Sequence, residues 1–164
     1  MIRSVMEEKF MELIGQNQKI IHKVVNLYVE KEPDKKDLFQ EILYQAWSSF
    51  SNFKGNSKFS TWLYRVAMNT AITHVKKRKK NNNARLFETG YRYISEEDEA
   101  RKRQIDILYR IINKLSPVDK ALVLLYIDNH SYEEMSEILG ISVSNVGVKI
   151  NRIKQFLKKE AGKY

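Results

Sequence analysis

The sequence of 164 residues contains no cysteine, which excludes disulfide bonds, thiolate zinc sites and a cysteine nucleophile. Its three histidines, His22, His74 and His130, are scattered, so we expect no metal ion and no other cofactor. No run of about eighteen uncharged apolar residues occurs, so we expect no insertion into a membrane. Charges near the N-terminus interrupt the apolar run that a signal peptide needs, which predicts a cytoplasmic protein.

Proline and glycine are also scarce, with two and six residues. No alternating apolar and polar stretch indicates a strand, so the sequence predicts an all-α fold. The first helix is expected over about 7–30 and the second after Pro33, with Asp34 or Asp37 as its N-cap. A third is expected from about Ser60, a fourth over 105–115 and a fifth from Pro117 to about 129. Three asparagines followed by an acidic stretch predict a flexible linker over 81–104, between small helical domains over 1–80 and 105–164.

The net charge of +9 is distributed in zones. Residues 42–87 contain nine Lys or Arg and no Asp or Glu, residues 88–99 contain five acids, and residues 141–164 contain six Lys or Arg and one acid. A single run of charge is more often a solvated helix face. Two separate basic zones on helical segments instead favour binding to nucleic acid.

Residues 131–159 have the pattern of a helix-turn-helix. Ser131 and Glu134 are spaced as a capping box, Gly140 suits the left-handed residue that ends a helix, and Ser142 can cap the next one. The second helix then repeats apolar residues at spacings of three and four, which predicts a buried stripe of Val143, Val146, Ile150, Ile153 and Leu157.

The opposite face of that second helix has polar and basic groups and no acid, which a helix in the major groove of DNA requires. We predict that its DNA-binding residues are Ser144, Asn145, Val148, Lys149, Asn151 and Arg152. The alternative is an ordinary αα-hairpin whose second helix is solvated. Gly147, inside this helix, either allows a close approach of DNA to the backbone or is simply tolerated.

A second pattern covers residues 55–80, where aromatic residues alternate with cations. Aromatic rings beside cations suit unstacked bases on a phosphate backbone, whereas duplex DNA would need only the cations. We expect Lys58, Phe59, Arg65 and Asn69 to contact nucleic acid. Helical spacing favours a core position for Trp62 and Leu63.

These two patterns, in this order, resemble the extracytoplasmic-function (ECF) sigma factors of bacterial RNA polymerase. Residues 37–47 and 59–75 are similar to sigma region two, and residues from 115 onward are similar to region four. The resemblance covers about residues 10–80 and 105–160. It implies a subunit that directs core polymerase to specific promoters and helps to open the −10 region during transcription initiation. It implies no catalytic residue and no enzymatic activity.

The resemblance also implies roles for residues and partners. The positions expected to bind the β′ clamp helices of core polymerase are Asp37, Gln40, Glu41, Gln45 and Trp47. The positions expected to bind the −10 element are Lys58, Phe59, Ser60, Thr61, Arg65, Asn69 and Lys76. The helix-turn-helix is expected at the −35 duplex and at the β flap, and an anti-sigma factor is a further candidate partner. The family often has a basic and a small polar residue where this chain has Gly147 and Val148, so Lys149 and Arg152 are expected to contribute more.

Two other classes of function are open to the sequence alone. A stand-alone helix-turn-helix regulator would explain residues 131–159 but not the aromatic and basic helix. A nuclease or recombinase would need clustered carboxylates for metal ions, and the basic zones lack them.

Overall fold

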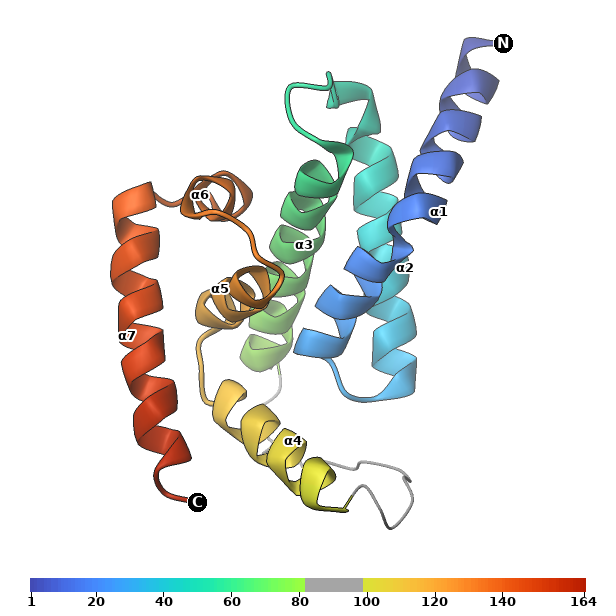
Figure 1. Ribbon diagram of the computed structural model, residues 1–164. Helices are drawn as coiled ribbons and strands as arrows, with labels where there is room; N and C mark the ends of the chain where they lie inside the picture. The colour runs from blue at the N-terminus through green and yellow to red at the C-terminus, as the bar shows by residue number, and fades with distance from the viewer. Residues whose placement is uncertain (82–98) are drawn as a thin grey trace. The chain divides into compact units, whose positions relative to one another are not determined.

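The computed structural model describes residues 1–81 and 99–164, which form seven α-helices and one short 3-10 helix, with no strand in these ranges (Figure 1). The helices divide into a first unit built around α1 to α3 and a second built around α4 to α7. This confirms the predicted all-α fold with two helical domains. Among the helices of the described ranges, none has the length and apolar character needed to cross a membrane.

The first unit is a bundle of α1 (Ile2–Tyr28), α2 (Glu32–Ser49) and α3 (Phe59–Asn81), with η1 (Phe50–Asn52) following α2. The three long helices pack against one another, and apolar residues at helical spacing bury their shared side. Side chains with no exposed surface come from all three helices, and the largest of them are Ile21, Val24, Leu38, Ile42, Leu63 and Met68.

Helix α1 is interrupted at Asn17, whose backbone leaves helical geometry at φ −122° and ψ 15°. The Asn17 side chain donates a hydrogen bond from Nδ2 to the carbonyl oxygen of Leu13, at 2.8 Å. Asparagine side chains compete in this way with the regular backbone ladder. Helix α1 is therefore kinked at Asn17, and Figure 1 shows the interruption within the α1 ribbon.

The start of α2 differs from the sequence prediction. Its N-cap is Lys31, which makes no side-chain capping bond, so the expected cap at Asp34 or Asp37 is wrong. Pro33 lies in the first turn, where its fixed φ suits the helix and its missing N–H is not needed. Asp34 lies inside the first turn and binds Arg78 near the end of α3, with 3.0 Å between Oδ2 and Nη1.

The second unit contains α4 (Glu99–Ile112), α5 (Pro117–Ile127), α6 (Tyr132–Leu139) and α7 (Val143–Ala161), with α4 and α5 packed on α7. Helix α4 includes residues 99–104, the end of the range predicted as linker, and residues 82–98 lie outside the described part of the chain. Of the predicted stripe of α7, Val146, Ile150 and Ile153 are buried. Leu157 is half-buried, and Val143 is 42% exposed.

Candidate nucleic-acid interface

Local hydrogen bonds set the ends of α6 and α7. The Ser131 hydroxyl oxygen accepts a bond from the Glu134 N–H at 3.1 Å, and Ser142 does the same for Asn145 at 3.1 Å. Gly140 ends α6 at φ 68°, a conformation that side chains with a Cβ disfavour. These features confirm the predicted boundaries of the helix-turn-helix.

The predicted capping box is only half correct. Glu134 does not return its carboxylate to the N–H of Ser131; its Oε2 lies 2.7 Å from Nδ1 of His130. His130 directly precedes the cap, and its ring is mostly buried. A charge-assisted bond to this ring therefore replaces the expected bond to the backbone.

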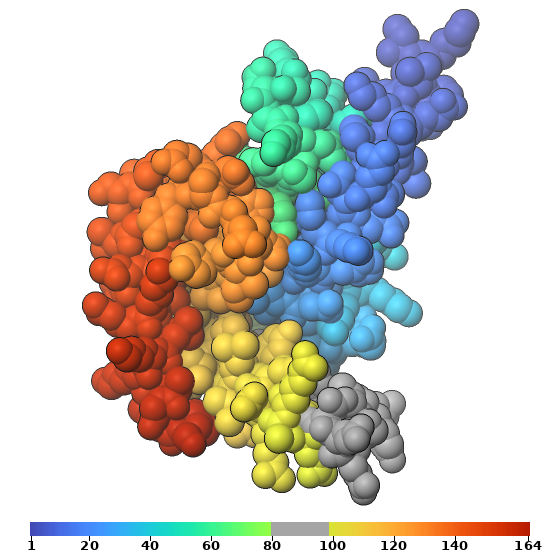
Figure 2. All heavy atoms as spheres, in the orientation of Figure 1, coloured from blue at the N-terminus to red at the C-terminus, as the bar shows by residue number. Residues whose placement is uncertain are grey.

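The polar face of α7 is exposed, as predicted. Ser144, Asn145, Val148, Asn151 and Arg152 are all exposed, and α7 is visible from end to end in Figure 2 (red). Lys149 differs because it is half-buried, with Nζ 3.9 Å from Oδ1 of Asp119 on α5. The expected reliance on Lys149 and Arg152 therefore rests mainly on Arg152, whose guanidinium is free to reach a base or a phosphate.

Gly147 lies against α6. A Cβ built on Gly147 would stand 3.7 Å from Cε2 of the Tyr132 ring, an ordinary van der Waals distance. The position therefore points toward Tyr132, and a methyl group would fit there. Packing inside the second unit therefore gives no steric reason for a glycine at this position.

The residues predicted at the −10 element extend from Lys58, just before α3, to Lys76 in the second half of that helix, and their exposures differ. Lys58, Arg65, Asn69 and Lys76 are exposed, and their cations and amide can reach a nucleic acid. Phe59 and Ser60 are half-buried. Thr61 is 7% exposed, so its side chain supports the unit and does not form part of the surface.

Phe59 belongs to a group of aromatic rings at this end of the first unit. Its ring centroid lies 5.4 Å from that of Trp62, 5.6 Å from that of Phe53 and 6.3 Å from that of Phe50. Phe50 also meets Phe10 of α1 edge-to-face at 5.1 Å. Edge-to-face packing of this kind holds rings in fixed orientations. Phe59 is thus a partly exposed ring on a rigid aromatic base.

The predicted core positions of α3 are those of Trp62 and Leu63. Leu63 has no exposed surface, while Trp62 is half-buried within the aromatic group. Tyr64, another aromatic residue of this helix, is only 4% exposed. A base therefore has Phe59, and not Tyr64, available for stacking.

The predicted polymerase-binding residues lie along α2. Asp37, Gln40 and Gln45 are exposed, and Glu41 and Trp47 are partly buried. The Trp47 ring packs edge-to-face on Phe10 at 5.1 Å. Asp37, Gln40 and Gln45 are therefore free for a partner, whereas Trp47 also holds α1 to α2.

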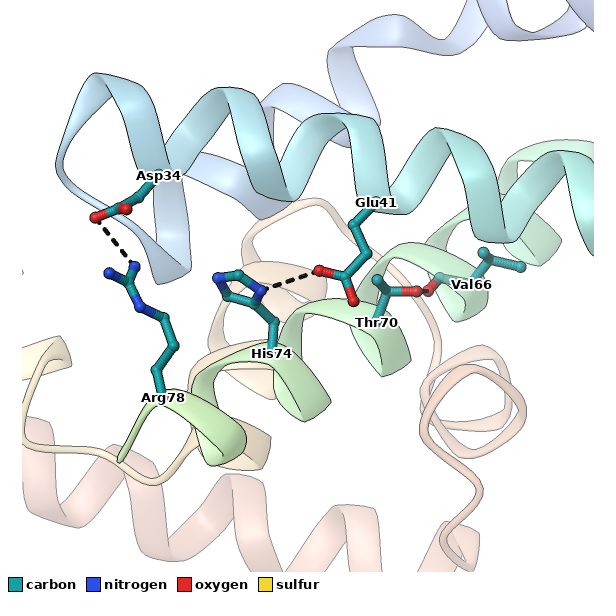
Figure 3. Close-up of polar contacts among 6 residues, drawn as sticks. All are labelled: Asp34, Glu41, Val66, Thr70, His74 and Arg78. Atoms are coloured by element: carbon teal, nitrogen blue, oxygen red, sulfur yellow. Dashed lines mark hydrogen bonds and ion pairs between the residues drawn. The ribbon is translucent and has the colours of Figure 1, made fainter. Parts of the chain in front are cut away.

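Two polar contacts join α2 to α3, and Figure 3 shows them side by side. Oε2 of Glu41 lies 3.0 Å from Nδ1 of His74, and the second contact is the pair of Asp34 and Arg78. One turn before His74, the Thr70 hydroxyl donates to the carbonyl oxygen of Val66 at 2.7 Å (Figure 3). Sequence reasoning missed both pairs because their members are far apart along the chain. Glu41 thus has a structural partner as well as its predicted role at the surface.

The two units together define a class: an all-α protein with a helix-turn-helix in one helical unit and an aromatic, basic helix in the other. Family models agree with this division. The model described as Sigma-70 region 2 matches residues 13–81, and that described as Sigma-70, region 4 matches residues 105–157.

Whole-chain comparisons narrow the class to a family. The chain is 31% identical to the ECF RNA polymerase sigma-E factor of Escherichia coli, over 82% of this chain and 78% of that protein. It is 28% identical to the ECF RNA polymerase sigma factor SigW of Bacillus subtilis, over 94% of this chain and 89% of that protein. The chain belongs to the ECF family of RNA polymerase sigma factors.

Solved structures share the fold. The sigma factor RpoE from Bartonella quintana, in complex with the anti-sigma factor NepR, superposes with a TM-score of 0.75 at 17% identity, covering 94% of this chain and 98% of that one. CnrH, in complex with the cytosolic domain of CnrY, superposes with a TM-score of 0.69 at 20% identity, covering 96% and 90%. The match to both sigma regions makes a stand-alone helix-turn-helix regulator the less favoured alternative.

Proposed function

We propose that this sigma factor directs core polymerase to promoters by holding single-stranded DNA of the −10 element with its first unit and duplex DNA of the −35 element with its second. The observation that carries the proposal is the half-exposed Phe59 ring, which has the exposed cations Lys58 and Arg65 close by in the sequence. A protein that binds only duplex DNA does not need an exposed aromatic ring, whereas an unpaired base can stack on it.

At the −10 element, the cations bind the phosphates of the nontemplate strand and Phe59 stacks on a base that has left the duplex. Unstacking a base costs a few kcal/mol, so these contacts must offset that cost for the open state to persist. The rigid aromatic base under Phe59 lowers the entropy lost on binding, because the ring is already oriented. Ser60, Asn69 and Lys76 extend the same surface, and Thr61 contributes to the fold beneath it.

At the −35 element, the exposed face of α7 enters the major groove. Arg152 suits a guanine edge, Asn145 suits an adenine edge, and Ser144 and Asn151 add hydrogen-bonding groups. Lys149 supplies charge near the backbone while its pairing with Asp119 holds α5 against α7. Contacts to phosphates by these cations should make promoter binding weaken steeply as salt rises.

On the polymerase, the exposed side of α2 binds the β′ clamp helices through Asp37, Gln40 and Gln45, with Glu41 and Trp47 at its edge. The helix-turn-helix unit contacts the β flap. An anti-sigma factor is a further partner proposed for this chain, in line with the solved neighbour that is in complex with the anti-sigma factor NepR.

The experiment that tests the proposal is transcription in vitro with purified core polymerase, with and without this chain, followed by sequencing of the transcript starts. We expect new starts that share two upstream elements, and no such starts with core polymerase alone. Failure to associate with core polymerase, together with tight binding to duplex DNA by the chain alone, would contradict it and favour a stand-alone regulator.

A further inference from the structure

Val148 is an apolar side chain in the middle of a polar helix face. It is 54% exposed, whereas Val146 and Ile150, two positions before and after it, are 0% and 3% exposed. Valine also forms helices less readily than alanine or lysine, by up to about 0.7 kcal/mol. Neither burial nor helix propensity therefore explains a valine at this position.

The neighbours of Val148 on the helix surface are all hydrogen-bonding residues. Ser144 and Arg152 lie four positions before and after it, and Asn145 and Asn151 lie three positions before and after it. All four are exposed, and none is acidic. Gly147 has no side chain, and a Cβ at this position would point toward Tyr132 and away from this face. The two γ-methyl groups of Val148 thus form an apolar spot surrounded by polar groups.

In the major groove only thymine presents a methyl group, whereas adenine, guanine and cytosine present donors and acceptors alone. Valine has no group to bond a donor or an acceptor, so against those edges it would remove water without replacing its hydrogen bonds. Against the thymine methyl it buries apolar surface on both sides. We propose that Val148 is a specificity residue that contacts the C5-methyl group of one thymine in the −35 duplex. The inference rests on the proposed function, because it requires α7 to lie in the major groove.

The test removes only the methyl group. Holoenzyme is formed from the full chain and core polymerase, and its affinity is measured for the mapped promoter with each −35 thymine replaced in turn by deoxyuridine. We expect one replacement to weaken binding of the natural chain about four-fold, the value of one buried methyl group. The same replacement should have almost no effect on Val148→Ser, which lacks both methyl groups.

Two further variants separate the contact from general effects. Val148→Ile keeps the apolar contact and should keep the four-fold penalty. Val143→Ser changes the other exposed valine of α7, which is 42% exposed, and should also keep it. Both positions changed in these three variants, Val148 and Val143, are exposed, so we expect folding to be retained.

The outcomes distinguish this inference from the proposed function. If no deoxyuridine weakens binding, if the −35 duplex holds no thymine, or if the penalty is equal in Val148→Ser, the inference is overturned while −35 recognition stands. If scrambling the whole −35 duplex leaves binding by the natural holoenzyme unchanged, the proposed function itself fails.

Discussion

Single side chains in the second unit set its stability in ways that the sequence leaves open. Gly147 is an interior helix position whose added methyl would meet Tyr132 at an ordinary distance. Because alanine loses less backbone entropy in a helix than glycine, Gly147→Ala should stabilise the unit by about 1 kcal/mol. Urea unfolding, with hydrogen exchange of the α7 amides as a local measure, would show it.

Gly140 provides the matched control, because nothing crowds it either but its φ is 68°. Gly140→Ala should destabilise the unit by about 1 kcal/mol, the cost of a left-handed alanine. A loss of stability in Gly147→Ala would mean that Tyr132 packs closer to α7 than the structure has it.

A second side chain, Glu160, makes the free energy of unfolding depend on pH in the acidic range. The hydrogen bond from Lys114, at 2.6 Å, and then that from Lys163, at 2.7 Å, lower the pKa of the Glu160 carboxyl to about 2. Its folded-state pKa is below the unfolded value, so these bonds stabilise the fold above pH 4.5, and the contribution is lost as the pH falls toward 2. A carboxyl titration by NMR should give a midpoint near this pKa.

Substitution of each lysine should raise the Glu160 pKa in proportion to the effect of its hydrogen bond. Lys114→Met should raise the Glu160 pKa more than Lys163→Met, because the Lys114 bond has the larger effect. Glu160→Gln should remove this part of the acid dependence of Tm. An unchanged acid dependence in Glu160→Gln would show that the bonds do not persist in solution.

Whole helices depend on their first residues, and α7 depends on Ser142. Losing this cap costs about 1 kcal/mol and loosens the turn that carries Ser144 and Asn145. We expect Ser142→Ala to weaken binding to a −35 duplex by the holoenzyme while leaving its assembly with core polymerase intact. Competition binding with −35 duplexes would measure the change.

Ser116 is the matched control, because its hydroxyl caps α5 by the same type of bond, to the Asp119 N–H at 3.2 Å. Ser116→Ala should cost similar stability without a comparable loss of −35 affinity. Equal losses in both variants would mean that general destabilisation, and not the N-terminal turn of α7, explains the effect.

Helix ends are also where sequence reasoning succeeded. Ser131, Gly140 and Ser142 act within a few residues of themselves, so short-range rules were sufficient to predict α6 and α7. The start of α2 was predicted wrongly, because Asp34 has a partner in Arg78, a residue near the far end of α3. No local pattern encodes such a partner.

The candidate site shows the same limit. Apolar residues cover most of the circumference of α3, so spacing alone could not decide that Thr61 and Tyr64 face inward while Phe59 stays partly exposed. The pair of Glu41 and His74 likewise depends on how two helices pack. Residue types and charge zones indicated which helices have exposed polar and basic residues, but not which of the predicted residues are buried.

In the proposed function, the first unit binds the −10 element and the second binds the −35 element. Substitutions in one unit should therefore change one of these activities and not the other. Arg152→Glu should lower affinity for the −35 duplex about ten-fold while polymerase binding is retained, because it reverses an exposed charge on the helix face proposed to enter the groove. Phe59→Ala should instead reduce promoter opening and leave −35 affinity nearly unchanged. Permanganate reactivity of unpaired thymines would measure opening.

Phe53→Ala is the control for Phe59→Ala, because its ring belongs to the same aromatic group, 5.6 Å away. If both variants impair opening equally, Phe59 acts through packing and does not hold a base. If Arg152→Glu reduces polymerase binding as much as −35 affinity, the division between the units is wrong.

The kink at Asn17 affects how the first half of α1 packs against the aromatic group around Phe59. On the N-terminal side of this kink, Phe10 packs on Trp47 and Phe50, and the Phe50 ring lies 6.3 Å from that of Phe59. A continuous rod through Asn17 would carry Phe10 elsewhere and leave those rings without their outer neighbour. The side-chain hydrogen bond of Asn17 thus helps to position Phe10 against the aromatic group that supports Phe59, the ring proposed to stack on an unpaired base.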